Sequence, residues 1–350
     1  MAKRVVRTAI VGMGIGRANG RAIEADPRGE VVALCDLIPE RMEEFAKELA
    51  KPVKFYTDYK EMCQDPDIDA VFVGTPNQWH VPIALEAVKN GKHVMVTKPL
   101  ADSEAAAREL VEAAEAAGVV NMMSLSMRFS DQVQYLGKLR DQGFYGDLYY
   151  AHAQARRRSR IPDWNLGFIQ KGGGAFRDMG VHVLDSVWWL LGKPKPVAAL
   201  GVAGAKFGPR GLGYWDYRQP KPEFYTQFAA DDYGGGFILF ENGIGLQVES
   251  FWAGHHGEND ATQIELFGTE AGAKLRPLTL YRTVNNAPQD ITVTLPETKR
   301  TSWNNIADHF IACILDGIPC EAPLRHGLIV QQMMEAILKS GETGKEVRLD

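Results

Sequence analysis

The stretch VVRTAIVGMGIGRANG, residues Val5–Gly20, decides the fold of the amino-terminal part of the chain. Its first half is rich in β-branched residues and predicts a short strand. Gly12, Gly14 and Gly16 then allow a tight turn that brings main-chain amides close to a pyrophosphate at the start of a helix. The spacing is one residue tighter than G-x-G-x-x-G, so a glycine-rich turn without a ligand is the alternative interpretation.

Strand-like and helix-like segments alternate through the first third of the chain. Apolar runs typical of strands buried on both faces lie at Glu30–Asp36, Asp69–Pro76, His93–Pro99 and Val119–Leu125. The segments Pro39–Ala50 and Asp102–Gly118 between them carry helix start and stop signals. This alternation predicts a doubly wound parallel sheet.

An acidic residue ends the second predicted strand. Asp36 lies 36 − 12 = 24 residues after Gly12, where a carboxylate accepts hydrogen bonds from the adenosine ribose hydroxyls. It also repels a 2′-phosphate, and neither Leu37 nor Ile38 supplies a compensating cation. The pattern therefore favours NAD over NADP, and a simple turn residue is the alternative role for Asp36.

Two further strand ends carry candidate ligand-binding residues, because ligands in such sheets lie beyond the carboxyl ends of the strands. Thr75, Pro76 and Asn77 follow one strand, with His80 at the start of the next helix. Lys98 follows the next strand, where it could donate a hydrogen bond to a substrate oxygen and stabilise developing negative charge. The alternative for Lys98 is a solvated loop lysine.

The segment GGGAFRDMGVHVLDSVWWLL, Gly172–Leu191, predicts a mostly apolar helix after a glycine turn. Asp178, His182 and Asp185 interrupt its apolar residues at spacings of four and three, so they form one stripe. One interpretation is a partly exposed helix with a polar edge. The other is a buried helix that presents an acid–base group to a cavity.

Five motifs in order resemble the glucose–fructose oxidoreductase, inositol dehydrogenase and rhizopine-catabolism family (Gfo/Idh/MocA). They are the glycine turn, CD at 35–36, TPNQWH at 75–80, TKPLA at 97–101 and GGGAFRDMGVHVLD at 172–185. The resemblance covers nearly the whole chain. It implies an α/β protein with an N-terminal Rossmann domain, at 1–126, and a C-terminal α/β domain with a large, mostly antiparallel open sheet, at 127–350. We expect the C-terminal helices to pack back on the first domain.

The resemblance also implies a catalytic set of Lys98, Asp178 and His182. Lys98 corresponds to the lysine of the family's E-K-P motif, although Thr97 replaces the usual glutamate, and Asp178 and His182 match the D-x-x-x-H pair. Whether Lys98 or His182 accepts the substrate proton stays open. The expected cofactor-binding residues are Gly12, Gly14, Ile15, Gly16, Asp36, Thr75, Pro76, Asn77, His80 and Lys98.

Candidate substrate residues lie shortly before the Gly172–Leu191 helix. Arg156 and Arg158 share one face of a predicted strand by alternation, which suits an acidic or hydroxylated substrate, whereas a solvated or subunit-facing row is the alternative. Trp164 could stack on a sugar ring or simply pack. Asp185 could support the substrate site or be a polar contact of its helix.

Composition excludes several function classes. The net charge of −5 gives no electrostatic footprint for nucleic acid or an anionic membrane. No apolar run reaches bilayer-spanning length, and the N-terminus has no signal-peptide core, so we expect a cytoplasmic protein. The four cysteines form no C-x-x-C pair and their spacing suits no zinc site, so we expect no metal.

The expected function is an NAD-dependent oxidoreductase that acts on a secondary alcohol of a small-molecule sugar, sugar derivative or cyclitol. Alternatives are an NAD-dependent glycosidase that oxidises its sugar transiently, and a non-catalytic cofactor-binding sensor. Substrate identity and reaction direction stay open. Because helices are expected to cover only one face of the large sheet, we also expect a homodimer or homotetramer.

Overall fold

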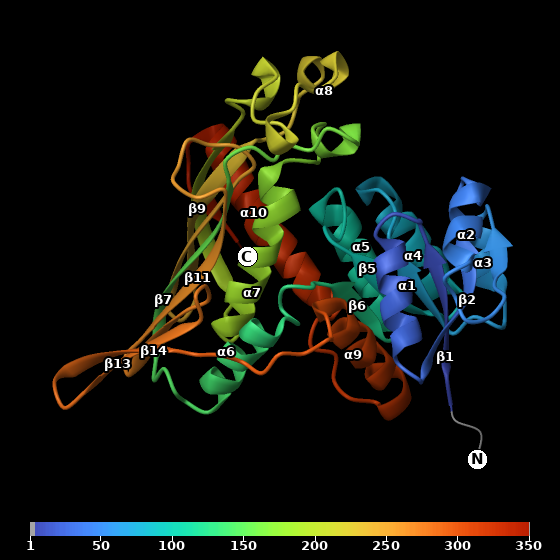
Figure 1. Cartoon of the computed structure of the whole chain (residues 1–350), viewed down its shortest axis with the longest axis horizontal. Helices are drawn as coiled ribbons and strands as arrows, with labels where there is room; N and C mark the ends of the chain where they lie inside the picture. Colours follow the sequence, from blue (N-terminus) through green and yellow to red (C-terminus); the bar gives the residue numbers. More distant parts are fainter. Residues whose placement is uncertain (1–3, 350) are drawn as a thin grey trace. The chain divides into compact units, whose positions relative to one another are not determined.

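The computed structural model describes residues 4–349, which form two compact units (Figure 1). Unit 1 contains the described residues up to Phe129 together with Thr298–Ile329. Unit 2 contains Ser130–Glu297 and the described residues from Val330 onward. The boundary expected after residue 126 thus differs by three residues (129 − 126) from the structural one, and a C-terminal segment belongs to unit 1.

Unit 1 is built on a six-stranded parallel sheet with the strand order β3-β2-β1-β4-β5-β6. The central strands are almost entirely buried, as their continuous apolar sequences require. The order reverses between β1 and β4, which is where ligands bind in doubly wound sheets. The strands are β1 (Val6–Val11), β2 (Gly29–Cys35), β3 (Lys54–Tyr56), β4 (Ala70–Val73), β5 (His93–Thr97) and β6 (Asn121–Ser124).

The helices of unit 1 alternate with these strands along the chain. Ser103 caps α5 with its side chain, and Thr301 caps α9 as part of a capping box with Asn304. Helix α9 packs against α1, so a C-terminal element completes this unit. The helical elements are α1 (Gly16–Ala25), α2 (Pro39–Ala46), α3 (Tyr59–Gln64), η1 (Asn77–Trp79), α4 (His80–Lys89), α5 (Glu104–Ala116) and α9 (Ser302–Asp316).

Unit 2 is built on a nine-stranded sheet with the order β14-β13-β12-β11-β7-β10-β9-β8-β15. Only the β7–β10 pair is parallel, which confirms the expected mostly antiparallel sheet. The strands are β7 (Leu148–Arg157), β8 (Pro196–Gly204), β9 (Tyr233–Phe240), β10 (Gly245–Phe251), β11 (Asp260–Gly268), β12 (Ala271–Lys274), β13 (Thr279–Val284), β14 (Ala287–Thr292) and β15 (Val347–Arg348).

One face of this sheet carries the helices, and Figure 1 shows α7 (Val181–Leu190) along it. The small side chains of β7 on this face, Ala151, Ala153 and Ala155, are buried and let α7 approach closely. The π-helical turn η3 (Phe176–Gly180) precedes α7 and contacts β10. The remaining helical elements are α6 (Asp131–Asp141), η2 (Leu166–Phe168), η4 (Gly208–Arg210), η5 (Trp215–Tyr217), α8 (Pro222–Thr226) and α10 (Leu324–Thr343), the last of which contributes to both units.

Candidate active site

The glycine loop of unit 1 has the backbone that a phosphate-binding turn requires. Gly12 has a φ of 87°, and a Cβ there would lie 2.6 Å from the carbonyl oxygen of Gly74, so only glycine fits. Gly14 is exposed, and nothing lies within 4 Å of the position of its missing Cβ. Open space above this loop and the adjacent start of α1 fit the close approach of a pyrophosphate.

The carboxylate of Asp36 joins the glycine loop to the segment after β2. Its Oδ2 accepts a hydrogen bond from the Met13 amide at 2.8 Å, and its Oδ1 accepts one from the Ile38 amide at 3.0 Å. Each carboxylate oxygen has a second lone pair, so the half-buried group can also accept ribose hydroxyls. The glycine loop and this carboxylate therefore fit NAD.

The residues after β4 have different roles from one another. Thr75 Oγ1 is buried and has no hydrogen-bond partner within residues 4–349, so it remains open to a ligand. Asn77 is half-buried at the start of η1. His80 is fully buried, and its ring nitrogens lie 2.8 Å from the carbonyl oxygen of Pro99 and 2.7 Å from that of Thr75. Burial lowers the pKa of His80.

His80 therefore connects the ends of β4 and β5 through main-chain contacts and does not present its side chain to a cofactor, which corrects the expectation of direct contact. The sequence pattern located it correctly beside the ligand edge but did not reveal its burial. The neighbouring Lys98 is half-buried beyond β5, between the buried Thr97 and Pro99, with a cis Lys98–Pro99 peptide bond. Because β5 is next to β4, Lys98 and Thr75 lie at the same edge of the sheet.

Asp178 and His182 lie together in unit 2, on η3 and α7 respectively. The expected single helix is thus a π-helical turn followed by an α-helix, a local geometry that occurs frequently at functional sites. The indole Nε1 of the buried Trp252 donates a hydrogen bond to Asp178 Oδ2 at 3.0 Å. Asp178 and His182 are half-buried, whereas Asp185 is 1% exposed and cannot touch a substrate without rearrangement.

A buried aspartate holds the start of η3 in place. Asp231 Oδ2 accepts the Phe176 amide at 2.9 Å, and the Asp231 carbonyl accepts the Ala175 amide at 2.9 Å. Gly174 has a φ of 113°, and a Cβ there would lie 2.0 Å from Asp231 Oδ1. Burial raises the pKa of Asp231 to about 6. Neither Asp231 nor Trp252 was predicted, since both reach the helix from distant segments.

The structure places the two arginines that were expected to face a substrate, Arg156 and Arg158, in different surroundings. Arg156 lies on the sheet face opposite the helices, with Glu249 Oε1 3.4 Å from its Nε. The strand register shows the same orientation. Arg156 pairs with Phe251, and the adjacent Ser250 lies on the helix side, where it donates to the Ala175 carbonyl at 2.8 Å. Because neighbouring residues of a strand point to opposite faces, Phe251 and Arg156 lie on the other face. Arg156 is therefore not near Asp178, and the subunit-facing alternative fits it better. Arg158 is exposed just beyond β7.

An aromatic cluster forms beyond the end of β7. The ring of Trp164 lies edge-on to that of Trp215, with centroids 4.9 Å apart, and 5.9 Å from that of Phe168. Arg160 stacks over Trp215 at 4.5 Å. Trp164 stays exposed, and the Phe168 carbonyl accepts the Gly174 amide at 2.9 Å, which links the cluster to the start of the Asp178 turn. Trp215 comes from the aromatic-rich segment Gly204–Asp232 and was not predicted.

Each group of expected residues thus has its own unit. The cofactor candidates and Lys98 belong to unit 1, whereas Asp178, His182 and the aromatic cluster belong to unit 2. Within residues 4–349, no helix is long and apolar enough to cross a membrane.

Comparison with known proteins identifies both parts of the chain. Residues 6–125 match the model of an oxidoreductase family with an NAD-binding Rossmann fold, and residues 133–274 match the Gfo/Idh/MocA C-terminal domain. The D-glucoside 3-dehydrogenase of Escherichia coli (strain K12) is 30% identical over 361 aligned residues, which cover 100% of this chain and 99% of that protein. Mouse (Mus musculus) trans-1,2-dihydrobenzene-1,2-diol dehydrogenase is 32% identical over 49% of this chain and 52% of that protein.

Solved structures share the fold over nearly the whole chain. A levoglucosan dehydrogenase in complex with NADH and levoglucosan superposes with a TM-score of 0.84 at 22% identity, covering 99% of both chains. An oxidoreductase domain protein from Kribbella flavida superposes with a TM-score of 0.86 at 21% identity, covering 99% of this chain and 100% of that one. Together with the two domain matches, these findings show that the chain belongs to the Gfo/Idh/MocA family of NAD-binding oxidoreductases.

Proposed function

We propose that this protein is an NAD-dependent dehydrogenase that oxidises a secondary alcohol of a sugar, sugar derivative or cyclitol. The observation that carries the proposal is the Asp178–Trp252 hydrogen bond of 3.0 Å. It fixes a half-buried carboxylate on a π-helical turn, one turn before the half-buried imidazole of His182. The 30%-identical relative is a D-glucoside 3-dehydrogenase, which makes D-glucosides the first substrates to test.

The proposed reaction oxidises the substrate carbinol by two electrons: a hydride leaves the carbon and a proton leaves the hydroxyl oxygen. NAD, when bound, supplies the acceptor for the hydride from the carbinol C–H. His182 accepts the proton of the substrate hydroxyl, and the carbonyl forms as the C–H bond breaks. The family resemblance implies that Lys98 donates a hydrogen bond to a substrate oxygen and stabilises developing negative charge. Asp178, oriented by Trp252, holds the substrate or the His182 ring in position.

The residues of unit 1 would hold the cofactor by complementary contacts. The amides of Gly14, Ile15 and Gly16 would face the pyrophosphate, with the start of α1 adding its favourable dipole. The Gly12 amide instead donates to the Cys35 carbonyl at 2.9 Å, so Gly12 would contribute by shaping the turn. Asp36 accepts the ribose hydroxyls. Thr75 Oγ1, which is buried without a protein partner among the described residues, donates to the cofactor, and Pro76 and Asn77 line the same strand end. His80 acts indirectly, by holding the Thr75 and Pro99 carbonyls.

The aromatic cluster is the proposed sugar platform. Trp164 presents an exposed indole whose orientation is fixed by Trp215 and Phe168. Such a surface suits the apolar C–H face of a pyranose, while the charged Arg160 beside it suits the ring hydroxyls. Arg158 is exposed close to this end of β7 and remains a candidate for the same task.

The proposal is tested with purified protein, NAD and a panel of D-glucosides, other sugars, cyclitols and aryl glycosides. We expect NADH formation with at least one polyol, and loss of most turnover with retained NAD binding in His182→Ala. His93→Ala is the matched control, since His93 is a half-buried histidine at the amino end of β5, at the edge of the sheet opposite the ligand edge. Aryl-group release without net NADH formation would instead establish the glycosidase reaction.

We further propose that a second copy of the chain covers the outer face of the nine-stranded sheet. Leu200 and Phe237 pair across β8 and β9 on this face, and both are exposed. The register continues the same face through Phe267 of β11 and Tyr281 of β13. Exposed apolar side chains of this face are Leu200, Val202, Phe237, Leu239, Phe267 and Tyr281. An apolar surface of this extent on one sheet marks an interaction site.

Polar groups at the centre of this face fit a specific contact. His152 lies 3.6 Å from both Glu249 and Glu265, and the interaction with Glu249 raises the pKa of His152. Light scattering is expected to give a dimer or tetramer for the wild type and a smaller species for Phe237→Glu. Phe55→Glu, at an exposed aromatic of β3 in unit 1, should leave the assembly intact. A monomeric wild type contradicts this proposal.

A further inference from the structure

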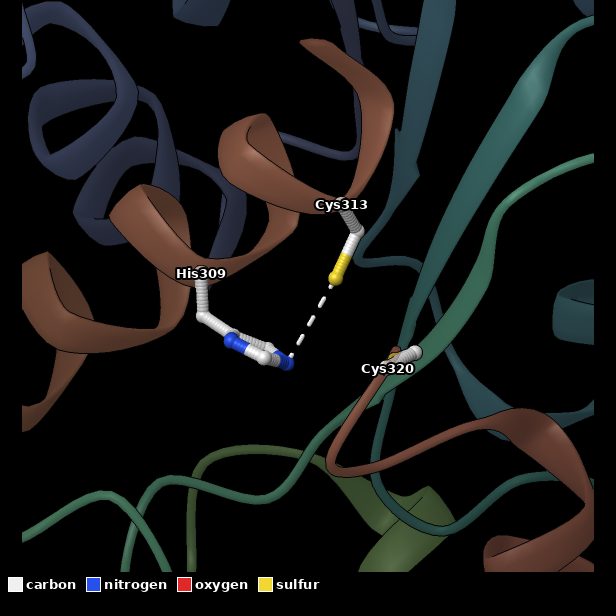
Figure 2. A group of neighbouring side chains, drawn as sticks. All are labelled: His309, Cys313 and Cys320. Carbon is white, nitrogen blue, oxygen red and sulfur yellow. Dashed lines mark hydrogen bonds between the residues drawn. The ribbon is translucent and has the colours of Figure 1, made fainter. Parts of the chain in front are cut away.

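Three metal-ligating side chains of unit 1 converge outside the nucleotide-binding edge (Figure 2). His309 and Cys313 lie one turn apart on α9, and Cys320 lies in the segment that follows this helix. Their ligand atoms all lie within 4.8 Å of one another. Cys313 is buried, whereas His309 and Cys320 are half-buried, so the group is reachable from solvent without being on the open surface. None of the three serves the proposed oxidation.

The spacing of these atoms matches a tetrahedral zinc ion. With Zn–S near 2.3 Å and Zn–N near 2.0–2.1 Å, a tetrahedral ion separates a sulfur from a nitrogen ligand by about 3.6 Å, and two sulfurs by about 3.8 Å. Cys313 Sγ lies 3.5 Å from His309 Nε2. The distance between Cys313 Sγ and His309 Nε2 therefore already matches one edge of the tetrahedron. The other two pairs of ligand atoms lie within 4.8 Å of each other, so each would shorten by no more than about 1 Å.

The hydrogen bonding of His309 also suits a metal. The Glu321 amide donates a hydrogen bond to His309 Nε2 at 2.8 Å, which fixes Nε2 as the unprotonated nitrogen, and a metal would replace this donor. A thiol binds a metal as its thiolate, so both cysteines would lose their protons when the metal binds.

The backbone around the cluster is held by contacts within unit 1. The Met123 amide donates to the Ala322 carbonyl at 2.8 Å, and the Leu324 amide donates to Asn121 Oδ1 at 3.0 Å. The ring of Phe129 lies against His309, with centroids 5.4 Å apart. The segment that carries Cys320 is thus fastened beside β6, so the three ligands approach one point without ordering a loop.

We propose that His309, Cys313 and Cys320 bind one zinc ion with water in the fourth position, and that this ion ties α9 to the chain beside β6. Among the described residues no fourth His, Cys, Asp or Glu joins the group. The ligands follow the pattern H-x3-C-x6-C, which lacks the C-x-x-C pair of common zinc sites, and so the expectation of no metal came from spacing alone.

The test uses the full chain, reduced and stripped of metal with a chelator, then titrated with Zn²⁺ or Co²⁺. We expect one zinc per chain, a rise in Tm on zinc binding, and a sulfur-to-cobalt charge-transfer band with Co²⁺. Each single replacement of a ligand should weaken zinc binding; the variants are Cys313→Ser, Cys320→Ser and His309→Gln. Loss of a hydrogen-bonding partner of a ligand costs roughly 10–100-fold in metal affinity, and loss of the ligand itself should cost more. If the buried Cys313→Ser does not fold, Cys320→Ser at its half-buried site decides.

Cys35→Ala with Cys63→Ala is the matched control, because burial raises the pKa of both thiols to about 12 and both are outside the cluster. This double variant should bind zinc as the wild type does. The proposal is overturned if the reduced wild type takes up no zinc, or if the three cluster variants bind zinc as tightly as the wild type. It is also overturned if Cys313 and Cys320 form a disulfide and the protein binds no zinc after that disulfide is reduced. None of these readouts depends on dehydrogenase activity.

Discussion

Asp231 should make the stability of unit 2 depend on pH in an unusual direction. The side chain is 9% exposed, and its carboxylate receives the Phe176 amide at the start of the turn that carries Asp178. Burial raises its pKa from 3.8 to about 6, which means that the folded state favours the neutral acid. Ionisation of Asp231 at neutral pH therefore costs folding free energy, whereas a carboxylate in an ion pair would gain it.

The size of the effect follows from the pKa difference. The difference between the two pKa values, 6 − 3.8 = 2.2, corresponds to a free energy of about 3 kcal/mol. The folded pKa lies above the unfolded one, so the contribution of the neutral acid is complete below about pH 4. It is lost as the pH rises through about 6. Asp231→Asn cannot ionise, and its amide oxygen can still accept the Phe176 amide.

Urea unfolding of the wild type and Asp231→Asn at several pH values between 4 and 8 measures this contribution. Tryptophan fluorescence reports mainly on unit 2, because five of the seven tryptophans, all except Trp79 and Trp303, lie there. We expect the free energy of unfolding of the wild type to fall relative to that of the variant by about 2.5 kcal/mol between pH 4 and pH 8, because part of the contribution is already lost at pH 4. A difference that stays constant within about 0.5 kcal/mol would refute the buried-acid explanation.

Three further predictions concern the site itself. Trp252→Phe removes a hydrogen bond to a carboxylate worth about 1.5–3 kcal/mol, so kcat/KM should fall roughly 10–100-fold while the Kd for NAD, measured by fluorescence titration, stays unchanged. Asp36→Asn should raise the Kd for NAD roughly tenfold or more and reduce the ratio of the NADP Kd to the NAD Kd. Equal NAD affinities in variant and wild type would contradict the proposed binding of the ribose by Asp36. Trp164→Ala should raise KM for a sugar roughly fivefold, which corresponds to a loss of about 1 kcal/mol of binding free energy, with little change in kcat. An effect on kcat alone would argue against stacking.

The sheet of unit 1 and its ligand edge could be predicted because they follow from local patterns. Continuous apolar runs predict strands buried on both faces, and the βαβ connections then bring Gly12, Asp36, Thr75 and Lys98 to the carboxyl ends of neighbouring strands. The glycine-rich sequence marks the turn after β1, where Gly12 adopts a φ of 87°. The mostly antiparallel sheet of unit 2 came from the family resemblance and is confirmed by its strand pairing.

The residues that support Asp178 could not be predicted, because they come from distant strands. Trp252 is 74 positions away from Asp178, and Asp231 is 55 away from Phe176. Alternation along β7 cannot show which face of the sheet Arg156 occupies. The contacts of Arg156 and His152 with Glu249 and Glu265 show that both lie on the face opposite the helices. Burial of His80 depends on contacts with two strand ends, which no local pattern contains.

The central claim is that Asp178, His182 and Lys98 serve NAD-dependent oxidation of a sugar alcohol. The most direct measurement is NADH formation from NAD and methyl D-glucosides by the wild type, His182→Ala and Lys98→Ala, with NAD binding measured in all three. The account predicts steady NADH formation by the wild type, and loss of most turnover in both variants with NAD still bound. Wild-type turnover that survives in His182→Ala, or NAD binding with no oxidation of any polyol, contradicts it.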